Sequence, residues 1–382
     1  MGFHEFSSPY DWSRIAAYKR TAKAAFGGMI DLSVGSPVDP VPDSVRKALA
    51  VAANDPNAYG YPATAGTADL RAAIAEWFSA ARDVDLQAIH ADVVPTVGSK
   101  EGVALMASLL HFGEDDVVVQ PKVSYPTYEI GTQLAGAQVL KVDDVADVAS
   151  WRNVPGVKAV WVNSPCNPTG EVYSVERMAG IVAAAREIGA VVLSDECYAL
   201  MQWRGATNSA DDDPLQSTPC ALRSDVCAGS AEGVLVLYSL SKQSNMAGYR
   251  TAFIAGDESL IASMSAYRKQ IGQIIPGPVQ AAMAAGLRDL ESVKVQHARY
   301  RERLGVLVSA LRAYGYCTDM PDGALYVWVR AKSGDCWTDM EQLAKIGIIA
   351  SPGEFYGAPE CLRFSATASD EAIASAAERL AR

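Results

Sequence analysis

The chain has 382 residues, of which 49% are hydrophobic and 20% charged, the balance of an ordinary globular protein with two or three domains. It carries 33 Lys and Arg against 44 Asp and Glu, a net charge of −11. A strongly acidic chain is repelled by phosphate backbones and anionic lipids, which argues against nucleic-acid and membrane partners. The seven cysteines form no C-x-x-C pair and the four histidines are scattered, so we expect no metal site.

The first residues contain neither the basic nor the apolar region of a signal peptide. No apolar run approaches the ~20 residues that a membrane-spanning helix needs. We therefore expect a cytoplasmic protein.

Strand and helix signals alternate through the middle of the chain. An extended segment at residues 31–42 comes first, and an apolar helical run opens at residues 98–100. Short β-branched runs predict strands at residues 117–119, 159–162, 191–193 and 234–237, and apolar residues at helical spacing predict a helix over 174–189. Strands that are apolar on both faces and separated by amphipathic helices indicate a mostly parallel sheet covered by helices on both sides.

The pattern changes after Pro276, where long helices over residues 280–311 precede short strands near 324–329. We therefore expect a large α/β domain over residues 51–276 and a smaller α+β domain over 277–382. Residues 1–50 are expected to form an N-terminal segment that packs with the small domain.

Polar residues follow several of the predicted strands, at the edge where open parallel sheets bind their ligands. The helix start Gly98-Ser99-Lys100 offers free N–H groups suited to a phosphate. The other candidates, in chain order, are Asn167, Asp195, Tyr198, Ser239, Ser241, Lys242 and Arg250. Taken singly, each has an ordinary explanation as a cap, a turn residue or a surface charge.

Taken together, these residues match the needs of pyridoxal 5′-phosphate. That cofactor requires a phosphate site, an acid group at its pyridine nitrogen, a donor to its phenolic oxygen and an amine for covalent attachment. The order of the motifs along the chain resembles the fold-type I pyridoxal-phosphate enzymes of the aspartate aminotransferase class, over residues 31–363. The most specific motif is Ser-Leu-Ser-Lys, ending at Lys242, with Arg250 eight residues later.

The resemblance implies an aspartate aminotransferase-like α/β fold, pyridoxal 5′-phosphate as the cofactor, small-molecule amino and 2-oxo acid substrates, and a homodimer with shared active sites. It implies that Lys242 binds the cofactor aldehyde and then moves the proton. Asp195 would pair with the ring nitrogen and help to stabilise negative charge in the ring.

The remaining residues receive their roles from the same resemblance. Asn167 and Tyr198 would hydrogen-bond the phenolic oxygen, and Tyr125 would stack on the ring, with Val123 as the alternative. The phosphate would be held by the backbone of Gly98, Ser99 and Lys100, by Ser239 or Ser241, by Arg250, and by Tyr61 of the partner subunit. Gly35, Asn167 and Arg363 would contact the substrate, with Arg363 able to bind its α-carboxylate through a bidentate fork.

Finer motifs, at residues 34–42, 125–131, 194–198, 241–250, 335–337 and 352–357, resemble the actinobacterial N-succinyldiaminopimelate aminotransferases of lysine and peptidoglycan-precursor synthesis. By that resemblance, the reaction exchanges an amino group between N-succinyl-LL-2,6-diaminopimelate and 2-oxoglutarate. Ser36, Cys166 and Gln243 depart from the expected pattern. Two alternatives stay open: another class I/II aminotransferase of aspartate or alanine type, and a pyridoxal-phosphate C–S lyase on the same fold.

Overall fold

The computed structural model of the chain describes residues 11–203 and 218–382. These residues fall into two compact units. The small unit holds the described residues within Met1–Gly35, Glu302–Met320 and Leu325–Arg382, and the large unit holds those within Ser36–Arg301 and Pro321–Ala324. The three-part domain division expected from the sequence stays a prediction.

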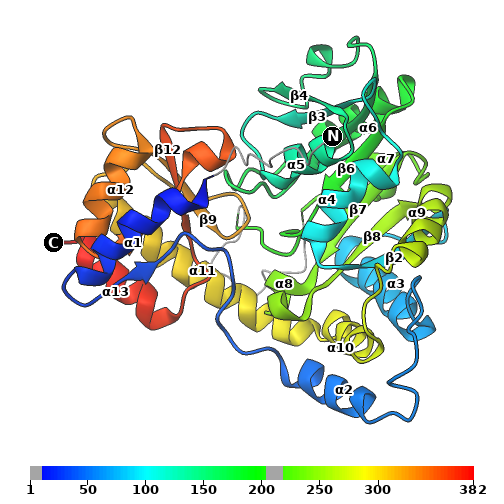
Figure 1. Cartoon of the computed structure of the whole chain (residues 1–382), viewed down its shortest axis with the longest axis horizontal. Helices are drawn as coiled ribbons and strands as arrows, with labels where there is room; N and C mark the ends of the chain where they lie inside the picture. The colour runs from blue at the N-terminus through cyan, green and yellow to red at the C-terminus, as the bar shows by residue number, and fades with distance from the viewer. Residues whose placement is uncertain (1–10, 204–217) are drawn as a thin grey trace, which may run out of the picture. The chain divides into compact units, whose positions relative to one another are not determined.

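The large unit is built on a seven-stranded sheet with strand order β2-β8-β7-β6-β5-β3-β4 (Figure 1). All neighbouring strands are parallel except where β8 pairs with β2 and β7, so the predicted mostly parallel sheet is confirmed. The strands are β2 (Ala91–Val97), β3 (Val117–Pro121), β4 (Gln138–Val142), β5 (Val157–Asn163), β6 (Val191–Asp195), β7 (Val234–Ser239) and β8 (Thr251–Asp257). The four strands expected from β-branched runs are β3, β5, β6 and β7.

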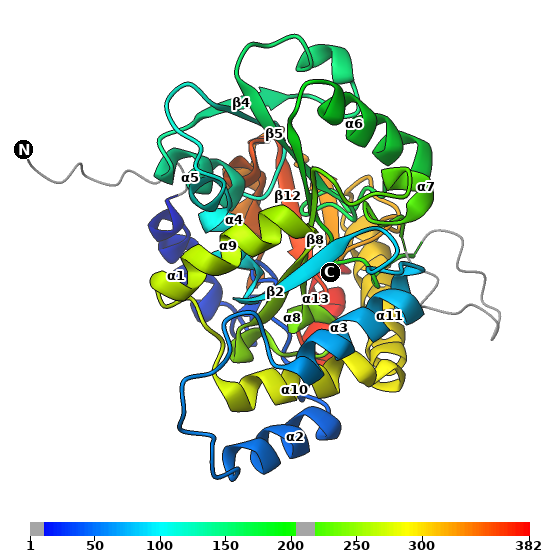
Figure 2. The ribbon, with the colours of Figure 1, turned by 90° about the vertical axis from the view of Figure 1, so that its right-hand side faces the viewer.

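Helices of the large unit cover both faces of this sheet (Figure 2). The α-helices of the large unit as a whole are α2 (Asp43–Ala53), α3 (Ala68–Arg82), α4 (Ser99–Leu109), α5 (Thr127–Leu134), α6 (Val175–Glu187), α7 (Ser224–Cys227), α8 (Leu240–Gln243), α9 (Glu258–Gln270), α10 (Gly277–Arg288) and α11 (Leu290–Ala313), whose residues from Glu302 onward belong to the small unit. The helix expected over residues 174–189 is α6.

Successive strand residues alternate between two hydrophobic cores, one on each face of the sheet. Val117 and Val119 of β3 join the core that includes α3, α6 and α10, whereas Val118 joins the core that includes α4, α5 and α9. Both faces of the inner strands β3, β5, β6 and β7 are therefore largely buried, which is why the sequence shows continuous apolar runs there instead of an apolar–polar alternation.

Strand direction brings several chain segments to one edge of the sheet. Asn163 pairs with Asp195 at the carboxyl ends of β5 and β6. Because β8 runs antiparallel, its first residue, Thr251, pairs with Val97 at the carboxyl end of β2. The segments that follow β2, β5, β6 and β7 and the segment that precedes β8 therefore share this edge.

The small unit contains a two-stranded parallel sheet and a three-stranded antiparallel sheet of order β11-β12-β9. Its elements are α1 (Ile15–Ala24), β1 (Ile30–Asp31), β9 (Tyr326–Arg330), α12 (Cys336–Lys345), β10 (Ile348–Ile349), β11 (Ser351–Pro352), β12 (Cys361–Ser365) and α13 (Asp370–Leu380), together with the end of α11. Arg363 of β12 lies opposite Trp328 of β9 and Ser351 of β11.

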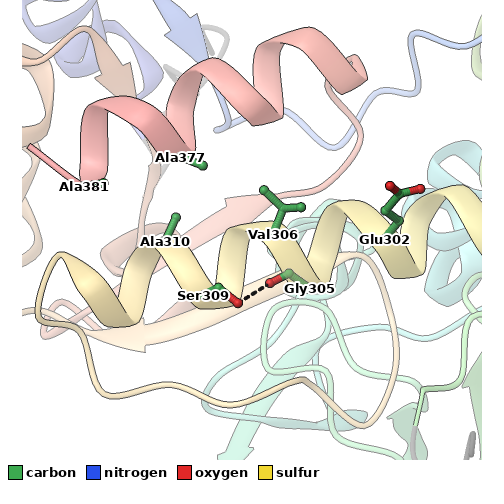
Figure 3. Close-up of a pocket in the computed structure, with 7 residues that line it drawn as sticks. All are labelled: Glu302, Gly305, Val306, Ser309, Ala310, Ala377 and Ala381. Atoms are coloured by element: carbon green, nitrogen blue, oxygen red, sulfur yellow. Dashed lines mark hydrogen bonds between the residues drawn. The ribbon is translucent and has the colours of Figure 1, made fainter. Parts of the chain in front are cut away.

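Within the small unit, α11 and α13 run side by side with a shallow apolar groove between them (Figure 3). Gly305, Val306 and Ala310 of α11 and Ala377 of α13 line the groove, and Ser309 Oγ donates a hydrogen bond to the Gly305 carbonyl at 2.9 Å. Within residues 11–203 and 218–382, no helix has both the length and the apolar character needed to cross a membrane.

Candidate active site

Asp195, the last residue of β6, is a buried carboxylate at the sheet edge described above. The Tyr128 hydroxyl donates a hydrogen bond to its Oδ2 at 2.7 Å, and the Cys197 N–H donates to its Oδ1 at 3.1 Å. Burial raises the pKa of Asp195 above its usual value, although the hydrogen bonds from Tyr128 and from the Cys197 side chain and backbone lower it. In the part of the chain that the structure describes, no lysine or arginine forms an ion pair with Asp195. A cationic ligand would therefore be stabilised here.

Asn163 ties the ends of β5 and β6 together. Its Nδ2 donates to the Asp195 carbonyl at 2.9 Å and to the Pro165 carbonyl at 3.1 Å, and its Oδ1 accepts the Asn167 N–H at 2.7 Å. The turn that carries Asn167 is thereby held next to Asp195. Sequence reasoning missed Asn163, although its position at the polar end of an apolar run is a signal that could have identified it.

Tyr128 is a second residue that sequence reasoning missed. Its buried ring stacks on Trp161 of β5, with centroids 4.4 Å apart and an angle of 15° between planes. Tyr125 meets the same ring edge to face at 5.7 Å. Tyr125 thus lies beside Tyr128, whose hydroxyl bonds to Asp195. Which of Tyr125 and Val123 stacks on a ligand stays a prediction.

Arg250 and Gly98 meet at the start of α4, where the sequence predicts an anion-binding site. Gly98 has a φ of +77°, and a Cβ on this residue would overlap the Arg250 guanidinium. Arg250 Nη1 donates to the Ala247 carbonyl at 2.8 Å, which orients the guanidinium. The positive side chain and the free N–H groups at the helix start together favour a phosphate.

Two serine hydroxyls lie near the residue that follows Arg250. Ser239 Oγ is 2.8 Å from Ser241 Oγ and 3.2 Å from the Thr251 carbonyl, and it accepts the Ser241 N–H at 3.1 Å. Thr251 directly follows Arg250 in the chain. The structure therefore brings together the predicted phosphate residues at the start of α4, at the junction of β7 and α8 and just before β8, although the Lys100 side chain is exposed.

Lys242, in α8, shares this site with Asp195. The charges of both residues act on the buried Cys197 thiol, which also interacts with the Ser99 side chain. Burial raises the pKa of Cys197 well above its usual range, so the thiol stays neutral. Tyr198, one residue further along, is also buried. The amine of Lys242 and the carboxylate of Asp195 are thus both close enough to Cys197 to act on it electrostatically.

Gly35 and Arg363 are brought together in the small unit by Tyr326, which sequence reasoning missed. The buried Arg363 guanidinium lies 3.9 Å from the centroid of the Tyr326 ring and 4.8 Å from that of Tyr356. Its Nη2 donates to the Ser33 carbonyl at 2.8 Å. A Cβ on Gly35 would overlap the Tyr326 hydroxyl, so glycine is required there. The cluster holds a rigid guanidinium, as recognition of a carboxylate requires.

Within the large unit, Tyr61 is a predicted site residue for which the described residues show no contact with the other predicted ones. It lies between α2 and α3 and is fully exposed, as is most of the neighbouring Tyr59. Exposed aromatic side chains of this size are typical of a surface that a protein partner covers.

The chemistry of the site in the large unit fits pyridoxal 5′-phosphate. The start of α4 with Arg250 suits the phosphate, the buried Asp195 suits a protonated ring nitrogen, and Lys242 supplies an amine. Among the described residues, no group of three or more His, Cys, Asp or Glu side chains could hold a metal ion.

Comparison with known proteins agrees with this chemistry. The family described as "Aminotransferase class I and II" matches residues 27–380. The chain is 40% identical over 373 residues to a 4-dedimethylamino-4-oxo-anhydrotetracycline transaminase of Streptomyces rimosus, covering 97% of this chain and 98% of that protein. It resembles the structure of a probable N-succinyldiaminopimelate aminotransferase from Thermus thermophilus, with 27% identity, a TM-score of 0.84 and coverage of 97% and 99% of the two chains. A Thermus thermophilus aspartate aminotransferase mutant gives 25% identity and a TM-score of 0.83 over the full length of both chains.

Proposed function

We propose that this chain, which belongs to the class I and II aminotransferase family, exchanges an amino group between N-succinyl-LL-2,6-diaminopimelate and 2-oxoglutarate. Membership makes it a pyridoxal-phosphate-dependent aminotransferase with the aspartate aminotransferase-like fold. The proposal therefore concerns the substrate. The observation that carries it is the likeness, over 97% of the chain, to the Thermus protein named as a probable N-succinyldiaminopimelate aminotransferase. The motifs quoted from the sequence support the same substrate.

In this proposal, the residues of the large unit bind the cofactor and move the proton. When bound, pyridoxal phosphate supplies the electron sink for the substrate carbon that exchanges its amino group. Lys242 Nζ would take the proton from that carbon and deliver it to the cofactor carbon that receives the amino group, and Asp195 would pair with the ring nitrogen. The remaining cofactor contacts come from Gly98, Ser99, Lys100, Tyr125, Asn167, Tyr198, Ser239, Ser241 and Arg250.

Arg363 binds the substrate α-carboxylate in this proposal, with Gly35 and Asn167 as further contacts. Because the rings of Tyr326 and Tyr356 both pack near the guanidinium, its orientation toward the carboxylate is restricted. A guanidinium that is already held in place loses little conformational freedom when the carboxylate binds, which favours bidentate hydrogen bonding.

A second candidate acceptor is the ketone of a polycyclic compound. It is favoured by the 40% identity to the Streptomyces rimosus transaminase, whose name specifies 4-dedimethylamino-4-oxo-anhydrotetracycline. The two candidates differ in chemistry, since one substrate is a flexible polyanion and the other a rigid ring system.

The deciding experiment measures kcat/KM for a panel of amino donors with 2-oxoglutarate as acceptor. The panel contains succinyl-diaminopimelate, free diaminopimelate, aspartate, alanine and acetylornithine, and Lys242→Ala serves as the inactive control. We expect succinyl-diaminopimelate to exceed the others by about tenfold or more, a difference of ~1.4 kcal/mol in transition-state binding. Equal or better turnover of aspartate or alanine would contradict the proposed substrate but not the family.

Two further assays separate the alternatives. Transfer from glutamate to the anhydrotetracycline ketone at a higher kcat/KM than to the 6-oxo product of succinyl-diaminopimelate would favour the polycyclic acceptor. Release of pyruvate and ammonia from cystathionine or cysteine without any oxo acid would favour the C–S lyase.

We also propose that the enzyme works as a homodimer with shared active sites, in which Tyr61 of the partner subunit completes the phosphate site. The full exposure of Tyr61 in the single chain supports this proposal.

A further inference from the structure

The hydroxyl of Tyr128 is held in place by packing on several sides. Its ring stacks on Trp161, and α5, the helix that carries it, lies directly against α4. A Cβ on Gly131 of α5 would come within 2.8 Å of the Ala104 carbonyl oxygen of α4, so the two helices are in backbone contact. The 2.7 Å hydrogen bond to Asp195 Oδ2 is therefore made by a group with little freedom to move away.

This hydrogen bond comes from a neutral donor. Burial and the neighbouring Asp195 raise the pKa of Tyr128 well above its usual range, so the phenol keeps its proton. A lysine or arginine in the same place would cancel much of the negative charge on Asp195. A phenol instead stabilises the carboxylate and leaves its charge available to a cationic ligand.

The two oxygens of Asp195 also have different donors. Tyr128 contacts Oδ2 from α5, and the Cys197 N–H contacts Oδ1 from the segment that follows β6. Two donors on two oxygens fix the plane of the carboxylate as well as its charge. The Cys197 thiol also acts on the carboxylate from the segment after β6, so Tyr128 is the side chain on α5 through which this control can be changed.

We propose that Tyr128 is a positioning residue that keeps the Asp195 carboxylate ionised and correctly oriented toward the ring nitrogen of the cofactor. This inference rests on the role proposed above for Asp195. Tyr128 does not itself touch the cofactor in this proposal, and it acts entirely through the carboxylate.

A pH dependence of cofactor binding must be assigned to Asp195 against the other ionisable groups around it. They are Tyr128 of α5, the thiols of Cys166 and Cys197, Glu196, and Lys242 of α8. Burial raises the pKa of Cys166 to about 11 and that of Cys197 well above its usual range, so both thiols stay neutral between about pH 6 and 9. Glu196 is held in a buried ion pair with Arg82 at 2.6 Å.

The test is Tyr128→Phe in the full-length protein, which removes the hydroxyl but keeps the ring on Trp161. The dissociation constant of pyridoxal phosphate is measured on the apoenzyme between pH 6 and 9. We expect binding about tenfold weaker than in the wild type, with the loss growing as the pH falls, because a carboxylate without its donor is protonated at higher pH. An unchanged affinity and pH profile would overturn the inference.

Tyr316→Phe is a matched control. The Tyr316 hydroxyl donates to Asp339 Oδ2 at 2.9 Å, in the small unit, so this substitution also removes a hydrogen bond from a tyrosine to a carboxylate. It should leave the cofactor dissociation constant unchanged. An equal loss of cofactor affinity in both variants would mean a general loss of stability and would contradict the specific role of Tyr128.

Two further variants, Asp195→Asn and the double variant Tyr128→Phe/Asp195→Asn, separate this inference from the proposed function. If Asp195→Asn binds the cofactor as the wild type does, the proposed role of Asp195 is wrong. If Asp195→Asn weakens binding, the double variant should bind no more weakly than Asp195→Asn alone, because Tyr128 acts through Asp195. Additive losses in the double variant would overturn the inference while leaving the role of Asp195 intact.

Discussion

The guanidinium of Arg250 occupies the space that a side chain on Gly98 would need. Gly98 links β2 to α4, and Arg250 precedes β8, which is the antiparallel neighbour of β2 in the sheet. A positive φ and this close approach both require glycine at position 98. The glycine at position 98 thus leaves room for the Arg250 guanidinium at the place where an anion would bind.

Gly98→Ala should therefore weaken cofactor binding. The new Cβ displaces the guanidinium and strains the backbone, so we expect the dissociation constant of pyridoxal phosphate to rise by about tenfold or more. The measurement is a titration of the apoenzyme followed by absorbance. Gly180→Ala, on the exposed face of α6 where a Cβ meets nothing within 4 Å, is the control and should bind as the wild type does. Equal affinities for Gly98→Ala and the wild type would argue against an anion site here.

Mixing two inactive variants tests the shared active site. Lys242→Ala and Tyr61→Ala dimers each lack a group in both sites, whereas a hybrid dimer carries both defects in one site and leaves the other intact. Random re-association of equal amounts should restore about a quarter of wild-type activity, because half of the dimers are hybrids with one working site. Subunits mixed without prior dissociation provide the control. Activity no higher than that of the unmixed variants would contradict sharing through Tyr61.

The aromatic rings around Arg363 should affect substrate affinity more than turnover. Replacing Tyr356 by Leu removes a ring whose centroid lies 4.8 Å from the guanidinium, whereas Tyr356→Phe keeps that ring. Since a cation–π contact contributes about 0.5–2 kcal/mol, KM for 2-oxoglutarate should rise between about twofold and thirtyfold in the Leu variant and stay near wild type in the Phe variant. Steady-state kinetics at varied 2-oxoglutarate checks this. A fall in kcat with unchanged KM would contradict a role in carboxylate binding.

His297 should make the enzyme less stable in mild acid. The ring is buried, its Nε2 lies 3.2 Å from the Gln202 carbonyl oxygen, and burial lowers the pKa of His297 below its usual 6.5. The unfolded chain therefore binds a proton near pH 6.5 more readily than the folded chain does. The contribution of this pKa difference to the free energy of unfolding is complete above pH 6.5 and is lost as the pH falls toward the folded-state pKa.

Urea unfolding at pH 7.5 and pH 5.5 measures this effect. The wild type should lose more free energy of unfolding on acidification than His297→Gln does, by up to about 1 kcal/mol. The comparison uses the change with pH within each protein, so a general destabilisation by the substitution does not affect it. The same loss in both proteins would show that His297 does not contribute.

Much of the large unit could be predicted from the sequence because its signals are local. β5, β6 and β7 are buried on both faces, so they appear as apolar runs that end at a polar residue. Asp195 and Lys242 stand out at or just beyond such strand ends, and chain order alone places them at one edge of a parallel sheet. β8 is harder to predict, because its small and mixed residues, including Ala252 and Ala255, give a weak strand signal.

The sequence by itself determined the kind of fold, the identity of the cofactor and the order of the residues that would bind it. Only the tertiary structure decided how those residues are supported. Tyr128 reaches Asp195 across 67 positions, and Tyr326 meets both Gly35 and Arg363 from another part of the chain. Such contacts depend on strand register and helix packing, which place side chains that have no regular spacing along the chain next to one another in space.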